Sequence, residues 1–346
     1  TTQNPTQGGS FMKMKSFKKF FVSIALSAVL TLSSASSVFA ATALLVPAEQ
    51  TAELTQENAS DTPAVESSEA PTAGASLSAQ SGISQTAASE TSVTIQWNPV
   101  ANAVKYAVSI SPLNSSSYRL LGYVGNSRNK ATINKLKAGT AYIIKITALN
   151  SSGIAISSRS VGCTTLYSKV SIKSSYANPG RYTFNMKTVT PSNAITGYKV
   201  VYQGSAARKP ITKYFKTRYS FTIPISDNTF YQVKIYPYLV LGNKRYVSST
   251  STNRYVANAI SLQKAGNTNT SMSVKWNRTA GANSYSIYIR YPGSDSFKKV
   301  KTTSSNSFTL TGMKKNTKYG IKVIANKKVK NKVWRSDSKI YNMSLS

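Results

Sequence analysis

The eleven residues LKAGTAYIIKI at positions 136–146 decide the fold, because the chain repeats their pattern twice more. The second copy is ISDNTFYQVKI at 225–235, and the third is MKKNTKYGIKV at 313–323. Each copy opens on an apolar residue and continues, at one fixed spacing, to threonine, tyrosine and a lysine between two apolar residues. The three tyrosines lie 89 and 88 residues apart. A period of this length predicts one small domain per copy.

A second pattern precedes the first and third copies. Short runs of alternating apolar and polar residues end at Trp97 and Trp276, and each tryptophan lies nine residues before a tyrosine, Tyr106 or Tyr285. Those tyrosines begin further alternating runs. Alternate residues of a strand face one side of a sheet, so the bulky members of each run are expected to point into a core.

The middle copy departs from this pattern. It has Tyr182, Phe184 and Met186 where the other two copies have their tryptophan run. Its next alternating run begins at Tyr198, three residues later than in the others. The middle domain is therefore predicted to share the fold but to fill its core differently.

These motifs resemble the fibronectin type III fold. The late motif resembles that fold's tyrosine corner, in which the hydroxyl bonds back to the backbone across an arch. The resemblance implies that Tyr142, Tyr231 and Tyr319 hold corners, and that Trp97 and Trp276 fill cores. The third copy looks most like modules in large surface proteins of Gram-positive anaerobes. The family serves mainly as spacers and as binding or adhesion modules.

The predicted fold class is all-β, with three tandem fibronectin type III-like, or immunoglobulin-like, β-sandwiches after a signal peptide and a disordered linker. The expected segments are a leader and signal peptide at 1–40, an acidic linker rich in Ser, Thr and Ala at 41–88, and domains at 89–167, 168–257 (the divergent copy) and 258–346.

The N-terminal segment has the features of an export signal. Four lysines (Lys13, Lys15, Lys18 and Lys19) precede an apolar run from Phe20 to about Leu32, and small residues at Val38 and Ala40 fit a cleavage site. The run is short for a membrane span, so cleavage is favoured over a retained signal anchor. Residues 1–11 are interpreted as leader, with Met12 or Met14 as the start.

The segment 41–88 contains no Lys, Arg, Trp, Tyr or Phe. Such a segment buries too little apolar surface to offset its chain entropy, and it is expected to be disordered. No wall-sorting motif or apolar tail is seen toward the C-terminus, so the protein is expected to be secreted and extracellular, held at the cell surface, if at all, without a covalent bond.

Positive charge is the most pronounced feature of the folded region. The chain has 43 Lys and Arg against 10 Asp and Glu. Residues 91–346 hold 39 of the bases and only three of the acids, and the bases number 8, 14 and 17 in successive domains. Such an excess favours polyanionic partners. Solubility and protection of strand edges are the alternative interpretation.

The candidate polyanion-binding residues gather in the third and middle domains. The densest run, 327–335, is expected to form a hairpin joining the last two strands. The candidates are Lys327, Lys328, Lys330, Lys332, Arg335, Lys298, Lys299, Lys301, Lys314, Lys315, Lys318, Arg208, Lys209, Lys213, Lys216 and Arg218.

Catalytic chemistry has few candidates. The chain has no histidine and one cysteine, Cys163. Its folded region has three aspartates, Asp227, Asp295 and Asp337, which are interpreted as turn or strand-end residues. We therefore predict no enzyme, no catalytic or metal-binding residue and no cofactor.

The predicted function is a non-catalytic surface or matrix binding and adhesion protein that contacts wall teichoic acid or an acidic glycan. A passive spacer and an extracellular nucleic-acid binder are the alternatives; nucleic acid is the weaker one because Lys outnumbers Arg. A protein partner is possible, and no membrane contact is expected after signal cleavage. A further hypothesis is that the acidic linker folds over the basic surface.

Overall fold

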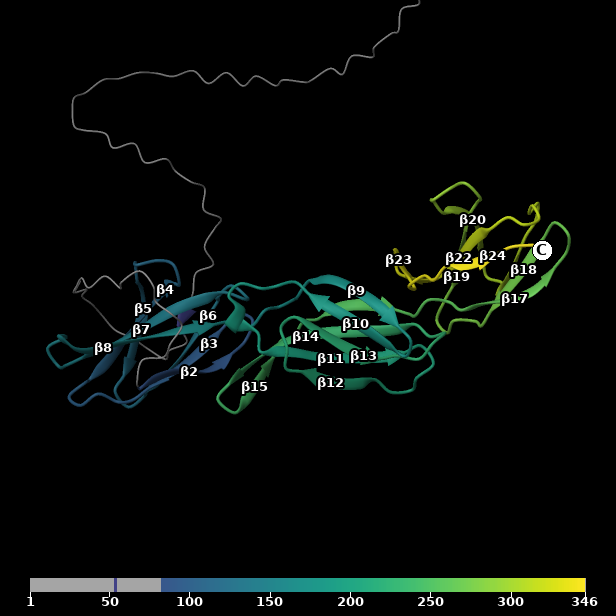
Figure 1. The fold of residues 1–346 in the computed structure, drawn as a ribbon. Helices are drawn as coiled ribbons and strands as arrows, with labels where there is room; N and C mark the ends of the chain where they lie inside the picture. Colours follow the sequence, from purple (N-terminus) through teal and green to yellow (C-terminus); the bar gives the residue numbers. More distant parts are fainter. Residues whose placement is uncertain (1–52, 55–81, 346) are drawn as a thin grey trace, which may run out of the picture. The chain divides into compact units, whose positions relative to one another are not determined.

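A computed structural model describes residues 53–54 and 82–345 of the chain. The predicted leader, the signal peptide and most of the predicted linker lie outside these residues. The described residues form three pairs of antiparallel sheets (Figure 1), so the all-β prediction is confirmed. Their one helix is the short 3₁₀ helix η1 (Ser192–Ala194). None of the described residues forms a helix with the length and apolarity needed to cross a membrane.

The first sandwich packs the sheet β1-β6-β3-β2 against the sheet β5-β4-β7-β8. Its strands are β1 (Glu53–Leu54), β2 (Ile83–Ala88), β3 (Val93–Trp97), β4 (Lys105–Pro112), β5 (Arg119–Gly125), β6 (Lys130–Asn134), β7 (Ala141–Leu149) and β8 (Ala155–Thr164). Both sheets supply the core: Ile95, Val108 and Ile144 are all fully buried. The alternating runs of the sequence thus become sheets with one buried face.

Strand β2 lies inside the segment that the sequence predicted to be disordered linker. It pairs with β3, and its end residues Ile83 and Ala88 are buried. The linker boundary at residue 88 is therefore too late. The prediction followed composition, but backbone hydrogen bonds to a neighbouring strand need no large side chains, and two buried apolar residues suffice to seat a strand of Ser, Thr and Ala.

The middle sandwich pairs the sheet β13-β10-β9 with the sheet β12-β11-β14-β15, and β16 adds to β14. Its strands are β9 (Ile172–Asn178), β10 (Arg181–Met186), β11 (Gly197–Gly204), β12 (Ile211–Phe215), β13 (Ser220–Pro224), β14 (Tyr231–Leu241), β15 (Lys244–Val247) and β16 (Thr252–Val256). Phe184 stacks on Phe221, with ring centroids 5.3 Å apart, and Met186 is buried beside them. Stacked phenylalanines thus occupy the core in which the other sandwiches have tryptophan.

The third sandwich pairs the sheet β17-β18-β21 with the sheet β20-β19-β22-β23, and β24 adds to β22. Its strands are β17 (Leu262–Asn267), β18 (Met272–Trp276), β19 (Ser284–Arg290), β20 (Lys298–Thr303), β21 (Ser307–Leu310), β22 (Tyr319–Val329), β23 (Lys332–Arg335) and β24 (Tyr341–Met343). The predicted basic hairpin joins β22 to β23. These are not the last two strands, because the chain returns to the other half of β22 as β24.

The cores of the first and third sandwiches have the same geometry. The rings of Trp97 and Tyr106 meet edge to face, with centroids 5.3 Å apart and planes at 66°, and those of Trp276 and Tyr285 do so at 5.3 Å and 67°. Both tryptophans are 2% exposed. Equal spacing in the sequence has thus produced equal packing.

The tyrosine of the late motif forms the same hydrogen bond in all three sandwiches. The hydroxyl oxygens of Tyr142, Tyr231 and Tyr319 accept a bond from the backbone N–H five residues upstream, at 3.1, 2.9 and 3.1 Å. The repeated motif therefore fixes the loop that enters β7, β14 and β22.

Candidate binding surface on the outer sheet faces

The larger sheet of the middle sandwich carries a row of tyrosine, lysine and tyrosine on its solvent side. Lys199 on β11 lies directly opposite Tyr214 on β12 and Tyr236 on β14. Its neighbours Tyr198 and Val200 are fully buried, so Lys199 points away from the core. The Lys199 amino group lies 5.7 Å from the centre of the Tyr236 ring.

An arginine extends this row. The Arg245 guanidinium on β15 lies 4.1 Å from the centre of the Tyr214 ring and 5.0 Å from that of Tyr238. The two rings themselves meet edge to face, with centroids 5.9 Å apart. A guanidinium over aromatic faces is attracted by the ring quadrupoles while its edge remains available for other partners.

The third sandwich has the reverse order, with a tyrosine between two lysines. Tyr288 on β19 lies opposite Lys299 on β20 and Lys322 on β22. The Lys322 amino group lies 5.6 Å from the centre of the Tyr288 ring and 4.3 Å from that of Phe297, and the Arg290 guanidinium lies 5.5 Å from Phe297. The lysine of the repeated motif is thus placed over aromatic rings.

The first sandwich has two such pairs. The Lys105 amino group lies 4.6 Å from the centre of the Tyr123 ring, and that of Lys145 lies 4.9 Å from Tyr118. We call these three surfaces the outer faces. They comprise Lys105, Tyr118, Tyr123, Lys145, Lys199, Tyr214, Tyr236, Arg245, Tyr288, Arg290, Phe297, Lys299 and Lys322.

Pairing a lysine with a ring changes what the lysine can do. Each contact contributes about 0.5–1 kcal/mol at an exposed site. The methylene stem lies along apolar surface while the charge stays at the water boundary. A lysine already held in place loses less conformational entropy when it binds an anion. The outer faces therefore present positioned cations beside aromatic surface.

The basic hairpin contains five of the predicted residues, Lys327, Lys328, Lys330, Lys332 and Arg335. Lys327 is half-buried, and its amino group donates to the carbonyl of Gly281 at 3.1 Å. The other four are exposed, and the Lys332 amino group lies 4.2 Å from the Trp334 ring centre. The tip residue Lys330 has a left-handed backbone, with φ 53°.

A second group of predicted lysines lies at the other end of β22. Lys314, Lys315 and Lys318 are exposed in the loop between β21 and β22, whereas the turn of the hairpin follows Val329. At the usual rise per residue, the two ends of β22 are about 30 Å apart. The structure does not bring these two predicted groups together.

Three other predicted lysines are on edge strands with a core-facing register. Lys213 on β12 lies opposite the buried Val200. Lys298 and Lys301 on β20 lie opposite the buried Ile289 and Ile287. All three are nevertheless exposed, so these edge strands extend past the core. Of the predicted β20 lysines, only Lys299 lies on an outer face.

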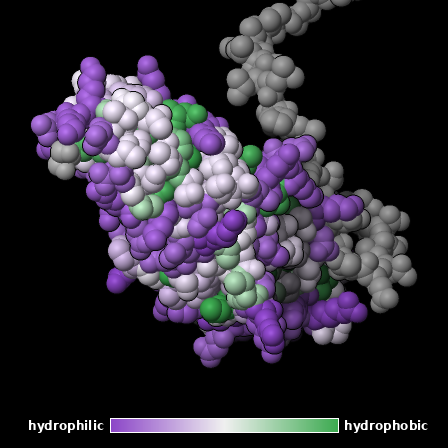
Figure 2. Space-filling view, turned by 90° about the vertical axis from the view of Figure 1, so that its right-hand side faces the viewer, coloured by the Kyte–Doolittle hydropathy of each residue, from purple (hydrophilic) through white to green (hydrophobic). Residues whose placement is uncertain are grey.

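The remaining candidates divide between the two ends of β12. Arg208 and Lys209 are exposed in the loop that enters it from β11. Lys216 and Arg218 follow it and line a surface pocket together with Tyr219. Hydrophilic and intermediate residues cover most of the face in view in Figure 2, with hydrophobic residues in small separate patches.

Groups able to do chemistry are few among residues 53–54 and 82–345. They contain no cluster of three or more His, Cys, Asp or Glu that could hold a metal ion. Asp227 accepts a bond from the Asn258 amide at 2.6 Å, and Asp295 is exposed between β19 and β20. Cys163 is buried in the first core, and burial raises its pKa to about 12, which keeps the thiol protonated and a poor nucleophile at neutral pH.

The aromatic half of the outer faces was not among the residues predicted from the sequence. Tyr123, Tyr236 and Tyr288 lie one residue from buried core positions, so their outward direction could have been derived from alternation. The pairing register between strands determines which lysine lies beside each ring. That register cannot be derived from the sequence of one strand alone.

A family model agrees with this architecture in two of the three sandwiches. The family model "Fibronectin type III domain" matches residues 78–163 and 259–339, the segments of the first and third sandwiches. A crystal structure of the chicken CNTN1 FN1–FN3 domains is 14% identical, with a TM-score of 0.26, and the match covers 77% of this chain and 98% of that one. A segment of two fibronectin type III domains from chicken tenascin is 16% identical, with a TM-score of 0.27, covering 51% and 97%. Residues 78–163 and 259–339 of this chain are therefore fibronectin type III domains.

Proposed function

We propose that the chain acts outside the cell as a non-catalytic binding protein whose outer faces contact an anionic polymer of a Gram-positive cell surface. Wall teichoic acid and acidic glycans are the polymers of this class. Charge holds the protein at the surface without a covalent bond. Fibronectin type III domains, which commonly serve as binding or structural modules, are consistent with this role.

The supporting observation is the repeated pairing of cations with rings. Each sandwich places lysines or arginines over tyrosine or phenylalanine on or beside the sheet that contains β7, β14 or β22, at 4.1 to 5.7 Å. Residues 91–346 carry 39 bases and three acids, so the acids of that region can neutralise only a few of these cations. The long-range field of such a surface attracts polyanions.

Binding of the full chain to immobilised wall teichoic acid, an acidic glycan, a neutral glycan and DNA, each at low and high salt, tests the proposal. We expect retention on the first two that weakens steeply with salt, as counterion release requires, and none on the neutral glycan. Retention that salt does not change, or no retention at low salt, would remove the proposal.

A matched pair of double variants tests where the contact lies. Lys299→Gln with Lys322→Gln removes two charges from the outer face of the third sandwich. Lys275→Gln with Lys339→Gln removes two exposed charges of the same sandwich elsewhere, from β18 and from the loop before β24. The slope of log affinity against log salt should fall by about two in the first variant, since each contacting lysine contributes about one, and stay unchanged in the second. Equal falls would exclude the outer face as the contact.

A passive spacer is the alternative, and it makes a different prediction. In a spacer, the domains set only a distance, so charge-neutralised variants would still reach the cell surface and function. Extracellular nucleic acid is the other alternative, because rings beside cations also suit single strands. Preference for DNA over both wall polymer and glycan would replace the polymer class proposed here.

A further inference from the structure

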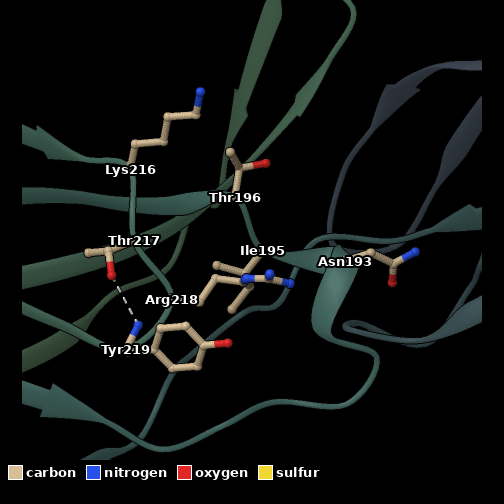
Figure 3. Close-up of a pocket in the computed structure, with 7 residues that line it drawn as sticks. All are labelled: Asn193, Ile195, Thr196, Lys216, Thr217, Arg218 and Tyr219. Atoms are coloured by element: carbon tan, nitrogen blue, oxygen red, sulfur yellow. Dashed lines mark hydrogen bonds between the residues drawn. The ribbon is translucent and has the colours of Figure 1, made fainter.

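The middle sandwich has a surface pocket of about 520 Å³ between two loops. One wall comes from the segment between β10 and β11, and the other from the segment between β12 and β13 (Figure 3). The volume lies within the range of about 300–1,000 Å³ typical of small-ligand sites. The lining residues are Asn193, Ile195, Thr196, Lys216, Thr217, Arg218 and Tyr219.

The first wall is the place where the middle repeat is longer. Trp97 and Trp276 precede the next core tyrosine by nine residues, but Met186 precedes Tyr198 by twelve. The segment so lengthened contains helix η1 and three of the lining residues. The three additional residues of the middle repeat therefore lie in the loop that forms one wall of the pocket.

The core tyrosine also changes its partner in the middle sandwich. The hydroxyls of Tyr106 and Tyr285 accept from the backbone N–H groups of Val100 and Thr279, on the strand's own entry loop. The Tyr198 hydroxyl donates instead to the Arg218 carbonyl, at 3.0 Å. Burial raises the pKa of Tyr198 to about 12, so this hydroxyl stays protonated and remains a donor. In the middle sandwich, where this loop is longer, the Tyr198 hydroxyl is therefore bonded to the backbone of the second wall.

Further bonds fix the second wall. The Arg218 guanidinium donates to the carbonyl of Ser192 on the opposite wall, at 2.9 Å. The Tyr219 carbonyl accepts from the backbone N–H of Met186 at 2.6 Å, and the Thr217 hydroxyl accepts from the Tyr219 N–H at 3.2 Å. A pocket held in this way loses little entropy when a ligand enters.

The lining combines charge with an exposed ring. In Figure 3 the Arg218 side chain and the Tyr219 ring extend toward the side of the view where Asn193 lies, and the Lys216 amino group points away from them. Tyr219 is 64% exposed. Arg218 uses one of its five N–H donors on Ser192, and the others suit the two oxygens of an anionic group. Among the residues that the structure describes, no carboxylate lines the pocket.

We propose that this pocket binds one acidic sugar unit of an anionic glycan, with Arg218 on the carboxylate or sulfate, Tyr219 against the ring and Asn193 on a hydroxyl. A bare phosphate would meet the cation but leave the aromatic ring and most of the volume in water. The inference rests on the proposed function and narrows its ligand from anionic polymer to acidic saccharide.

Variants of the full chain test the site. Tyr219→Ala removes the ring, and Tyr176→Ala is its control, an exposed tyrosine on β9 of the same sandwich. Arg218→Gln removes the charge, and Arg181→Gln is its control, an exposed arginine on β10 of the same sandwich that is not among the candidate residues. The probes are polygalacturonate, dextran sulfate, polyglutamate and neutral dextran. Polyglutamate carries carboxylates without sugar rings, and comparison of the first two separates carboxylate from sulfate.

We expect wild type to bind at least one charged polysaccharide more tightly than polyglutamate. Arg218→Gln and Tyr219→Ala should each weaken that binding about tenfold, and both controls should stay near wild type. Thermal unfolding by circular dichroism checks that all four variants remain folded. A folded Tyr219→Ala variant with unchanged preference for the polysaccharide overturns the inference.

A short oligosaccharide separates this inference from the proposed function. Trigalacturonate is large enough to occupy the pocket but carries too few charges for the multiple contacts by which a polymer would bind the outer faces. Binding of trigalacturonate that depends on Arg218, in a chain that retains no polymer, would keep the pocket and remove the polymer-binding function. Salt-sensitive retention of polymers with no binding of trigalacturonate or of a sulfated trisaccharide would do the reverse.

Discussion

The hydroxyl oxygen of Tyr319 lies 3.1 Å from the backbone nitrogen of Lys314, and Tyr142 and Lys137 repeat the bond at the same distance. We predict that Tyr319→Phe lowers the free energy of unfolding of the third sandwich by about 1 kcal/mol, the usual net contribution of one hydrogen bond. Amide hydrogen exchange in β21 and β22, recorded at increasing urea concentration, measures this change in the free energy of unfolding. Tyr291→Phe, which removes an exposed hydroxyl, should change nothing; equal effects of the two variants would contradict the prediction.

We predict that a tryptophan in place of Met186, like those of the first and third cores, destabilises the middle sandwich. Met186 is buried beside Phe184 and Phe221, whose stacked rings take up the space that an indole fills elsewhere. Met186→Trp should therefore destabilise the middle sandwich by about 1–3 kcal/mol through overpacking, whereas Met186→Leu should cost less than about 1.5 kcal/mol. Calorimetry of the full chain compares the two. A more stable tryptophan variant would mean that the core has unfilled space.

Cys163 should report the opening of the first sandwich. Burial raises its pKa to about 12, so iodoacetamide should label the folded chain at neutral pH far more slowly than the urea-unfolded chain. The folded state holds this proton more tightly than the unfolded state does. The stabilisation is therefore full below about pH 9 and is lost as the pH rises toward 12. Fast labelling of the native chain would contradict the buried position.

The tip of the basic hairpin should be more stable with glycine. Lys330 has φ 53°, which costs an L-residue about 1–2 kcal/mol and costs glycine almost nothing. Lys330→Gly should raise the free energy of unfolding by about 0.5–1 kcal/mol and, if the hairpin touches the polymer, lower the salt slope by about one. Lys328→Gly, in the extended backbone of β22, removes the same charge and should be destabilising. Urea unfolding and salt-dependent retention measure both effects.

The fold could be predicted in part because a few positions carry most of the information. Trp97 and Tyr106 recur as Trp276 and Tyr285 at the same interval of nine residues, and Tyr142 recurs at intervals of 89 and 88 residues. Each has one structural role that its residue type suits. Strand β2 was missed because Ser, Thr and Ala pair through backbone atoms, and composition does not record backbone pairing.

The binding surface was harder to predict than the fold. The positions of the lysines in the sequence indicate which domains are basic. They do not indicate on which side of a sheet each lysine side chain lies. Lys299 and Lys301 are two residues apart, yet the irregular pairing between Ile287 and Tyr288 places them on opposite sides of β20. The pocket at Arg218 is formed by two separate loops. The sequence showed only that the first of them, between β10 and β11, is longer than the corresponding loop of the other two repeats.

The core-facing lysines of the edge strands have a consequence for a chain of similar domains. Sandwiches joined by short connections meet one another at millimolar effective concentration, at which an open strand edge would readily accept a strand from its neighbour. Lys213 on β12 and Lys298 and Lys301 on β20 would have to be buried for such pairing to extend the sheet, and burying an unpaired charge is costly. The excess of lysine that attracts a polyanion thus also disfavours strand exchange between neighbouring sandwiches.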